Sequence, residues 1–545
     1  MLIDRYSRKL LEVVELTKLR PGIVILYLLT AAIIVYLFVE NFVFSSGFSI
    51  LAFREIDDLA FQVSIRKAHL AIMEGNVKQL FYLNDYAYGW VYWFFMSIVT
   101  LPSFLLDHYF SIEWPLIVTP RQVSLVFTLA SLIVIRKIVR LLGGNEVIAA
   151  LVVLAYILQP QIGYFSLRFG TVSAVSFFCI LSVFFTLKVE SFKDLNFYRM
   201  IVALSVAGAI KLSGLLISPV ILLILFSKLE LDKYKEQLVD VIKGFFGFIF
   251  LISILSFPQL PYVFFFKSNA FESLLNNYIS MISKPSGASN ISLFDFLIQG
   301  IAPSTLSLLS FVSLLCLSIL GFNSPRCRLL MLGFTISFSI LVLFIGNVLS
   351  FTSYMTAFYF LPFIAIVYAR KCGVVLVFVV ALLGLDFITG LPKFASFNYN
   401  GSYRHSNYYL KQANKADDFA LASDIYDCVS KDNGSHIYID FSTPSFLNPL
   451  STPNVCLTWV WNDLKSNSGY CNGSIDYLVF DKSSPGFLND TDFTSFLSGV
   501  EVKGHDRYIN DRENRRKVMN GEVFADQKFE LKCKFDKALV YKAAE

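Results

Sequence analysis

Charged residues are scarce in this chain. They make up 16% of its 545 residues, whereas soluble domains carry about 25%. Hydrophobic residues reach 55%, and they gather in uninterrupted stretches of about twenty, the length that crosses a hydrocarbon core of roughly 30 Å. We therefore expect a chain that spans a membrane many times. The net charge of +5 comes from short basic clusters between the apolar stretches, which is typical of topology signals and not of nucleic-acid binding.

Several signatures of soluble-enzyme chemistry are also missing. The sequence holds no glycine-rich nucleotide-phosphate loop, no dinucleotide fingerprint and no metalloprotease helix. Histidine occurs five times, at scattered positions: His69, His108, His405, His436 and His505. A metal site built from several histidines is therefore not expected, and we predict a surface or capping role for each.

Twelve apolar stretches are candidates to cross the membrane, at residues 23–44, 86–106, 118–139, 146–165, 170–187, 199–210, 213–227, 242–257, 300–321, 328–350, 353–369 and 372–391. If all of them crossed, most of the later basic clusters would face outward, contrary to the positive-inside rule. We predict that 86–106 does not cross, because its two ends are polar or helix-breaking. This leaves about eleven crossings, a cytoplasmic N-terminus and an external C-terminus.

The stretches 199–210 and 213–227 are short, and Lys211 stands between them. They form either a tight hairpin with Lys211 at the outer face or one long broken helix. The hairpin keeps every later basic cluster inside, and we therefore prefer it.

The composition divides the chain into a membrane domain, 1–391, and a polar tail, 392–545. The tail has a helix-like stretch at 408–429 and strand-like runs at 436–441 and 477–480, so we predict a small external α/β domain. It also holds four cysteines, Cys428, Cys456, Cys471 and Cys533. We expect at least one disulfide, and the short spacing makes Cys456–Cys471 our first choice.

Acidic residues mark the start of the first external loop, which we place at about 44–117. Glu55, Asp57 and Asp58 follow the first helix closely, and carboxylates at a membrane surface are costly unless they are solvated or used. Alone, this motif fits a charged helix end equally well. An amphipathic stretch to about Glu74, a break at Gly75 and the run 84–90 follow it in order.

That order resembles the C-type (GT-C) integral-membrane glycosyltransferases, which include protein O-mannosyltransferases and lipid A aminoarabinose transferases. Asp57-Asp58 matches the acidic motif of the group, Gly75 matches its recurrent glycine, and the segment 86–89 takes the place of its His-Pro-Pro element. The segments 160–170, with Arg168, and 209–214, with Lys211, are similar to two later motifs. The resemblance covers about residues 20–390. The residues directly after Arg168 include no carboxylate. A second catalytic or metal-binding acid would therefore come from Glu55, Asp107 or Glu113, or be absent.

The resemblance implies a sugar donor carried on a polyprenyl phosphate. A carboxylate would take the proton of the acceptor hydroxyl as it attacks the anomeric carbon, and Asp57 or Asp58 is our candidate. Fixed cations would stabilise the departing lipid phosphate, and the candidates are Lys78, Arg168, Lys211 and Lys267. Glu55, Tyr86 and Tyr88 are expected to contact the acceptor. Asp57 and Asp58 are also the residues that could hold a divalent cation, Mg²⁺ or Mn²⁺.

The leading hypothesis is therefore a polyprenyl-phosphate-sugar-dependent glycosyltransferase of the bacterial inner membrane. Its site would face the periplasm, and its acceptor would be an external glycan, lipid or protein. One alternative is an O-antigen ligase or polymerase, although those usually place their large loop late and between helices. A transporter is the other, although the expected helices hold few ionisable residues.

Overall fold

The computed structural model describes residues 21–46, 68–81, 89–110, 114–167, 169–229, 234–258, 325–345, 356–365, 437–440, 455–458, 475–482, 485–498, 502–536 and 538–544, together with a few single positions between them. The boundary expected near residue 391, the apolar stretches 300–321 and 372–391 and the first part of the external loop lie outside these segments.

Helices form where the sequence is apolar. In chain order they are α2 (Pro21–Ser46), α4 (Val77–Leu80), α5 (Trp90–Phe110), α6 (Trp114–Leu141), α7 (Glu146–Ile157), α8 (Pro160–Ser166), α9 (Val172–Lys188), α10 (Leu195–Ile210), η1 (Leu212–Ile217), α11 (Ser218–Phe226), α12 (Tyr234–Ser256), α17 (Pro325–Ile345) and α19 (Leu361–Ala365). The stretch expected at 146–165 is divided, because the chain leaves helical geometry between α7 and α8.

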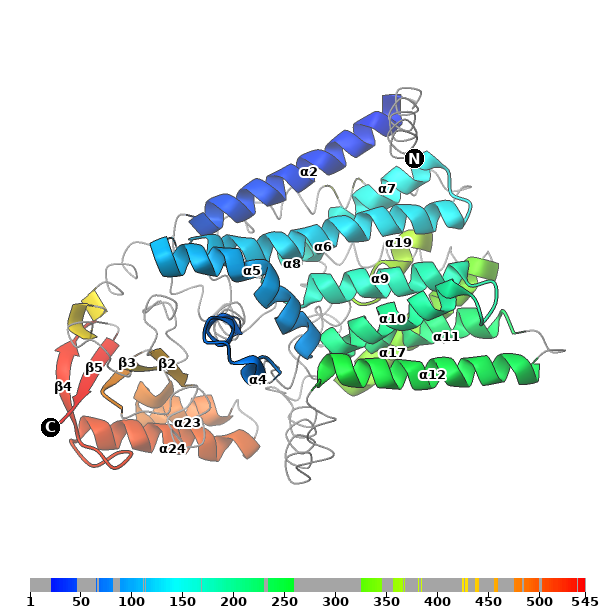
Figure 1. Ribbon diagram of the computed structural model, residues 1–545. Helices are drawn as coiled ribbons and strands as arrows, with labels where there is room; N and C mark the ends of the chain where they lie inside the picture. Colours follow the sequence, from blue (N-terminus) through cyan, green and yellow to red (C-terminus); the bar gives the residue numbers. More distant parts are fainter. Residues whose placement is uncertain are drawn as a thin grey trace.

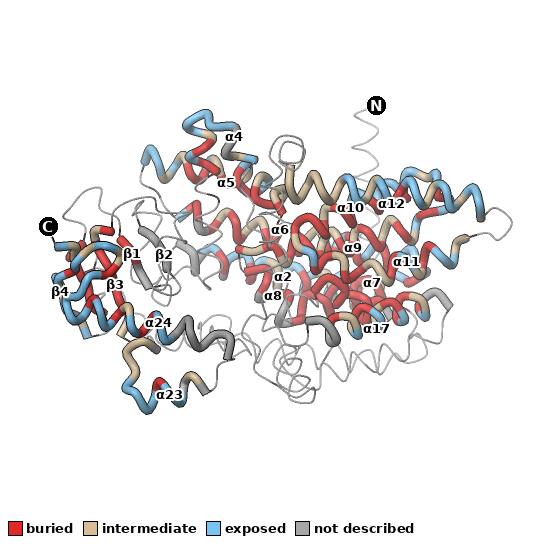
Figure 2. The backbone as a smooth tube through the Cα atoms, turned by 90° about the horizontal axis from the view of Figure 1, so that it is seen from below, coloured by how far each residue is buried: buried red, intermediate tan, exposed pale blue. Residues whose placement is uncertain are grey.

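The described helices pack side by side into a bundle. α9 and α10 lie at its centre and contact α6, α11 and α12 (Figure 1). Their residues are largely buried, whereas α2 and α12 turn broad apolar faces outward (Figure 2). Outward-facing apolar surface of this kind is stable when lipid covers it.

Basic clusters gather at one end of the bundle. Glu146, at the start of α7, accepts hydrogen bonds from Arg136 at 2.7 Å and from the Tyr27 hydroxyl at 2.5 Å. Lys193, before α10, lies 4.0 Å from Asp240 in α12. The loops 142–145 and 189–194 and the residues 227–229 after α11 all lie at this end (Figure 1). The arrangement agrees with the positive-inside topology, in which this end is cytoplasmic.

The hairpin expected at Lys211 is confirmed. Lys211 is extended between α10 and η1, and the N–H of Gly214 donates to its carbonyl at 2.8 Å. η1 then folds back so closely that a Cβ at Gly214 would lie 2.5 Å from the Ala207 carbonyl oxygen. The chain therefore turns back at Lys211 and does not run on in one direction as a long broken helix, while the place of Lys211 at the outer face stays a prediction.

Four described segments are long and apolar enough to cross a membrane: Pro21–Val39, Trp90–Phe110, Trp114–Leu141 and Lys235–Ser256. The second is α5, which we predict not to cross. α5 begins where α10 and α12 end, and it runs obliquely away from the layer of α9, α10 and α12 toward the start of α6 (Figure 1). Its orientation in the membrane and the number of crossings stay predictions.

The described part of the tail contains a five-stranded sheet. Its strands are β1 (Ile437–Asp440), β2 (Val455–Thr458), β3 (Tyr477–Asp481), β4 (Phe529–Lys534) and β5 (Ala538–Ala543), in the order β2-β1-β3-β5-β4. β1 pairs in parallel with β2 and β3, and β5 is antiparallel to β3 and β4. The expected strand-like runs correspond to β1 and β3.

Helices α23 (Asp490–Ser498) and α24 (Val502–Met519) accompany the sheet. A disulfide joins Cys428 to Cys533, so the prediction of at least one bridge is confirmed. The side chains of Cys456 and Cys471, our first choice, lie outside the described part of the chain.

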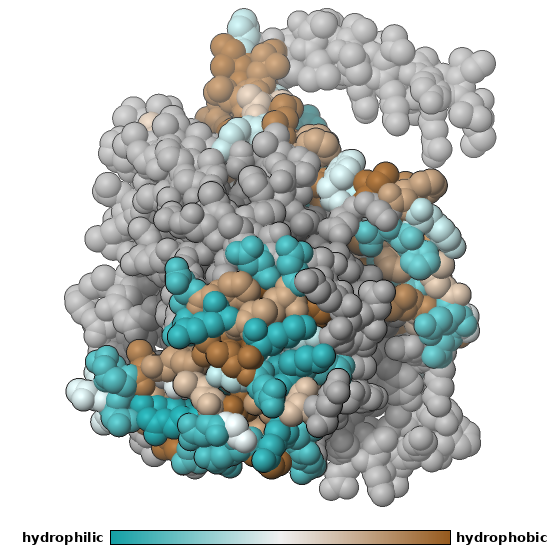
Figure 3. Space-filling model, turned by 90° about the vertical axis from the view of Figure 1, so that its left-hand side faces the viewer, coloured by the Kyte–Doolittle hydropathy of each residue, from teal (hydrophilic) through white to brown (hydrophobic). Residues whose placement is uncertain are grey.

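The outward surface of the tail is mainly hydrophilic, with apolar patches between the polar side chains (Figure 3). Charged contacts hold α23 against α24. Asp490 accepts a hydrogen bond from Arg516 at 3.0 Å and lies 2.8 Å from Arg512. The Arg516 hydrogen bond and the charge of Arg512 lower the pKa of Asp490. This surface contrasts with the apolar exterior of the bundle.

Candidate functional site

The predicted site residues fall into two groups. Lys211 is described in full, and Lys78 lies in the helical turn α4, although its side chain is not described. The remaining candidates lie outside the described residues: Glu55, Asp57, Asp58, Tyr86, Tyr88, Glu113, Arg168 and Lys267. Asp107 lies in the last turn of α5.

Gly89 stands at the point where several chain segments meet. Its N–H donates to the carbonyl of Ile210, the last residue of α10, at 3.3 Å. A Cβ built on Gly89 would lie 1.9 Å from the carbonyl oxygen of Ala209 and 3.1 Å from the Cα of Ser256 in α12. Only glycine allows this approach, because every side chain carries a Cβ.

Two aromatic residues in the first turn of α5 extend this contact. The Tyr92 hydroxyl donates to the carbonyl of Gly170 at 2.8 Å, and the Trp90 Nε1–H donates to the carbonyl of Leu80 at 2.6 Å. Tyr92 is buried. We call these contacts the Gly89 junction, which consists of Leu80, Gly89, Trp90, Tyr92, Gly170, Ile210 and Ser256.

Each segment that meets at the Gly89 junction carries a residue that the sequence indicated independently. Lys78 is two residues before Leu80, Tyr88 directly precedes Gly89, and Arg168 is two residues before Gly170. Lys211 directly follows Ile210, and Lys267 follows Ser256 by eleven residues. The structure thus joins backbones within two residues of Lys78, Tyr88, Arg168 and Lys211, which lie far apart in the sequence, whereas Lys267 is eleven residues from Ser256 and lies outside the described residues.

His69 departs from our expectation of a surface or capping role. It is fully buried, and its Nε2 lies 3.0 Å from both the Ser97 carbonyl oxygen and the Thr100 hydroxyl oxygen. Its ring lies 4.7 Å from that of Phe104. The prediction was wrong for this histidine, because a polar ring can be buried where hydroxyl and carbonyl groups bond to it. His69 holds the helical residues 68–73 against α5.

Arg121 is a residue that the sequence reasoning missed. It lies in the second turn of α6 with 1% of its surface exposed. Among the described residues of the membrane domain, it is the one Lys, Arg, Asp or Glu that is buried. A buried guanidinium is costly unless anionic or polar groups compensate it. The signal was an arginine after Pro120 inside an otherwise apolar stretch.

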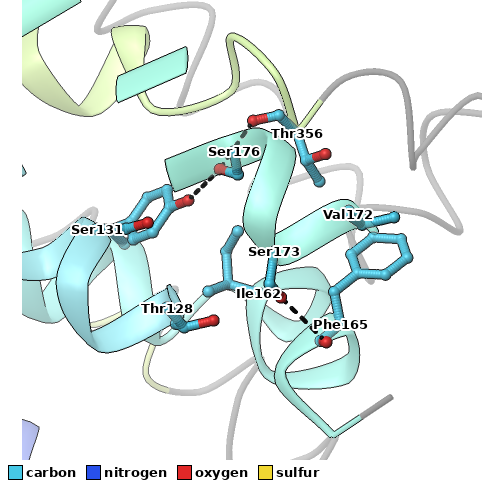
Figure 4. Close-up of a pocket in the computed structure, with 9 residues that line it drawn as sticks. Thr128, Ser131, Ile162, Phe165, Val172, Ser173, Ser176 and Thr356 are labelled. Carbon is cyan, nitrogen blue, oxygen red and sulfur yellow. Dashed lines mark hydrogen bonds between the residues drawn. The ribbon is translucent and has the colours of Figure 1, made fainter. Parts of the chain in front are cut away.

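Arg121 begins a polar stripe on one face of α6. Ser124, Thr128 and Ser131 follow at spacings of three and four residues, and all are buried. Thr128 and Ser131 reach a small pocket between α6, α7 and α9, which is lined by Thr128, Ser131, Tyr156, Ile162, Phe165, Val172, Ser173, Ser176 and Thr356 (Figure 4).

The hydroxyl groups of the pocket are hydrogen-bonded to their neighbours. Tyr156 and Ser176 lie 3.1 Å apart, and Ser176 donates to the Thr356 carbonyl at 3.1 Å (Figure 4). Thr128 lies 2.8 Å from the Ser166 hydroxyl. These bonds tie α6, α7, α8 and α9 together, so we assign the pocket a structural role.

No group of three or more His, Cys, Asp or Glu side chains that could hold a metal ion occurs in the described part of the chain. Asp57 and Asp58, the expected ligands of a divalent cation, lie outside that part.

No family model matches the chain, and no curated protein matches it by sequence. Among solved structures, the chain is similar to ArnT from Cupriavidus metallidurans bound to undecaprenyl phosphate. The identity is 12%, the match covers 94% of this chain and 97% of that chain, and the TM-score is 0.48. The same protein in the apo state matches at 11% identity over 88% of this chain and 92% of that chain, with a TM-score of 0.49.

Proposed function

We propose that this chain is a GT-C-type glycosyltransferase that moves a sugar from a polyprenyl-phosphate donor to an external acceptor. The observation that carries the proposal is the Gly89 junction. It links the segments that contain Lys78, Tyr88, Arg168 and Lys211, and the sequence indicated each of these by motif or charge.

In the reaction, an oxygen of the acceptor hydroxyl forms a bond to the anomeric carbon of the sugar. The bond between that carbon and the phosphate oxygen breaks, and its electron pair leaves with the lipid phosphate. A carboxylate takes the hydroxyl proton. We assign this role to Asp57, with Asp58 orienting the acceptor or binding a divalent cation. Glu55, Tyr86 and Tyr88 would contact the acceptor.

The negative charge of the departing phosphate needs fixed cations, which act more strongly in a partly dry site than in water. We assign Lys78, Arg168, Lys211 and Lys267 to this role. We propose the same role for Arg121, a buried cation on α6 that also interacts with other groups of the chain. The scarcity of other buried charges among the described membrane residues favours an enzyme over a proton-coupled carrier, which would retain ionisable groups along its path.

The proposed localisation is supported by the distribution of basic residues. The basic loops lie at one end of the bundle and the Gly89 junction at the other. With the basic end in the cytoplasm, the site faces the periplasm of a bacterial inner membrane. The acceptor there would be a glycan, a lipid or a protein.

The test is a transfer assay with the purified protein and a panel of polyprenyl-phosphate sugars, in which released polyprenyl phosphate is measured. Asp57→Asn keeps the shape of the side chain but not its basicity, so turnover should fall by about 10²–10⁴-fold. Asp536→Asn, in an exposed turn of the tail, is the matched control and should retain full turnover. Release from none of the donors would contradict the proposed function. Normal turnover in Asp57→Asn, in Asp58→Asn and in the double variant would contradict the assignment of the base.

A further inference from the structure

The Gly89 junction has little freedom to adjust. The atoms that would meet a Cβ at Gly89 are the Ala209 carbonyl oxygen and the Ser256 Cα, and both belong to the backbone. Rotation of a side chain therefore cannot relieve the contact. Gly247, in the middle of α12, has no atom within 4 Å of its Cβ position and provides a natural comparison.

Three hydrogen bonds fix the start of α5 to three other segments. They join Gly89 to Ile210, Tyr92 to Gly170, and Trp90 to Leu80. The Trp90 ring also stacks on Phe81, with centroids 6.2 Å apart. Each acceptor is a backbone carbonyl, so each bond fixes the position of another segment's backbone relative to the start of α5.

From this geometry we infer that Gly89 and Tyr92 are positioning residues for the transfer reaction. They set the spacing between the backbone that precedes Gly89 and the backbones that carry Lys211 and Arg168. That these residues serve a sugar-transfer reaction rests on the proposed function, whereas the spacing itself rests on the geometry of the junction. A displacement of about 1 Å can slow a reaction by about 10²-fold when reacting groups must be aligned.

Paired substitutions test the positioning role. Gly89→Ala should lower kcat by at least tenfold, because the added methyl group must push α5 away from α10 and α12. Gly247→Ala makes the same chemical change in open space and should leave kcat unchanged. Tyr92→Phe removes one hydrogen bond and keeps the ring, so kcat should fall several-fold while Tm stays within about 2 °C and the KM for the donor changes less than kcat.

A crosslinking measurement reports the spacing without any assay of activity. Tyr88 and Lys211 adjoin the two residues whose N–H and carbonyl oxygen lie 3.3 Å apart. Covalent geometry keeps the Cα atoms of these two positions within about 8.5 Å of each other, a range that includes the roughly 4.4–6.8 Å of a disulfide, so we expect cysteines at both positions to form one on mild oxidation. Peptide mass spectrometry of the unreduced protein detects the bridge. Adding Gly89→Ala should slow its formation at least fivefold, and adding Gly247→Ala should not.

The two measurements separate failure of the inference from failure of the proposed function. If the bridge does not form in the parent pair, or forms equally fast with Gly89→Ala, the positioning role is wrong even where the protein transfers sugar. Normal kcat in both Gly89→Ala and Tyr92→Phe would also overturn it. If the crosslinking follows expectation and no donor is used, the proposed function fails while the spacing set by the junction stands.

Discussion

At the scale of single residues, the burial of Arg121 marks it as a candidate functional residue, although the apolar composition of its surroundings gave no sign of it. The apolar stretch around it predicts a helix whether or not the arginine is present. Burial of the guanidinium would cost several kcal/mol without compensation, and arginine suits oxygen anions because its planar group donates in a fixed fork. Arg121 interacts with other groups of the chain, and we propose that it also binds the oxygen anion of a lipid phosphate.

Replacement of Arg121 tests this role. We expect Arg121→Gln to weaken the binding of polyprenyl phosphate at least tenfold, because the charge that offsets the phosphate is lost. Arg121→Lys should recover part of the affinity, since it restores the charge without the fork. Retention of radiolabelled polyprenyl phosphate by the purified protein measures the effect. Lys137→Gln, an exposed position on the same helix, is the control. Equal retention by Arg121→Gln and the parent would remove Arg121 from the phosphate site.

At the scale of elements, the apolar stretches predicted much of the described membrane domain. Helices lie on the expected stretches that the structure describes, and the turn at Lys211 was anticipated because the charge stands between two short runs. The start of α12 at Tyr234 was missed, since its first turns are polar. Convergence at the Gly89 junction could not be predicted, because it depends on which helix ends meet in space.

The tail was harder to predict from its sequence. α24 carries little apolar periodicity, and part of its packing comes from charged groups. Arg515 is buried, donates to Asp511 at 3.1 Å and lies 5.2 Å from the centroid of the Phe480 ring. The disulfide closes over 105 residues, whereas spacing alone favoured the nearest pair. Contacts between distant segments decide both features.

The end of α9 offers an element-scale prediction. The ammonium group of Lys228 donates to the carbonyls of Thr186 and Leu187, at 3.0 and 3.1 Å, and to that of Val189. These carbonyls belong to the last turn of α9 and the residue that follows it, where a helix leaves carbonyl groups without intrahelical partners.

We expect Lys228→Met to lower the free energy of unfolding by about 1–3 kcal/mol, the cost of leaving buried acceptors without a charged donor. Thermal unfolding of the detergent-solubilised protein should show this as a lower Tm. Lys235→Met, at an exposed position in α12, should leave Tm unchanged. An unchanged Tm in Lys228→Met would show that water replaces the ammonium group without cost.

At the scale of the whole molecule, the distribution of charge distinguishes the two ends of the helical bundle. Basic loops occupy one end of the bundle, and the Gly89 junction occupies the other. The tail has its own hydrophobic clusters around the sheet, separate from the cluster that fills the bundle. If the tail and the junction share one side of the membrane, an acceptor held by the tail can reach the site without crossing the bilayer.

The position of α5 decides this arrangement, because its crossing would reverse the side of every later loop. Cysteines can be placed at Val77, before α5, and at Tyr109, in its last turn, where the native side chains are 61% and 64% exposed. If α5 does not cross, a membrane-impermeant maleimide should label both in intact cells, together with a cysteine at Asp536 in the tail. A cysteine at Glu190, among the basic loops, should react only after the membrane is permeabilised. The native cysteines Cys179 and Cys327 are buried and Cys428 is bonded to Cys533, and replacement of the remaining four, Cys316, Cys372, Cys456 and Cys471, by serine removes the other native thiols. Labelling of Val77 and Tyr109 from opposite sides would show that α5 crosses and that the topology is wrong.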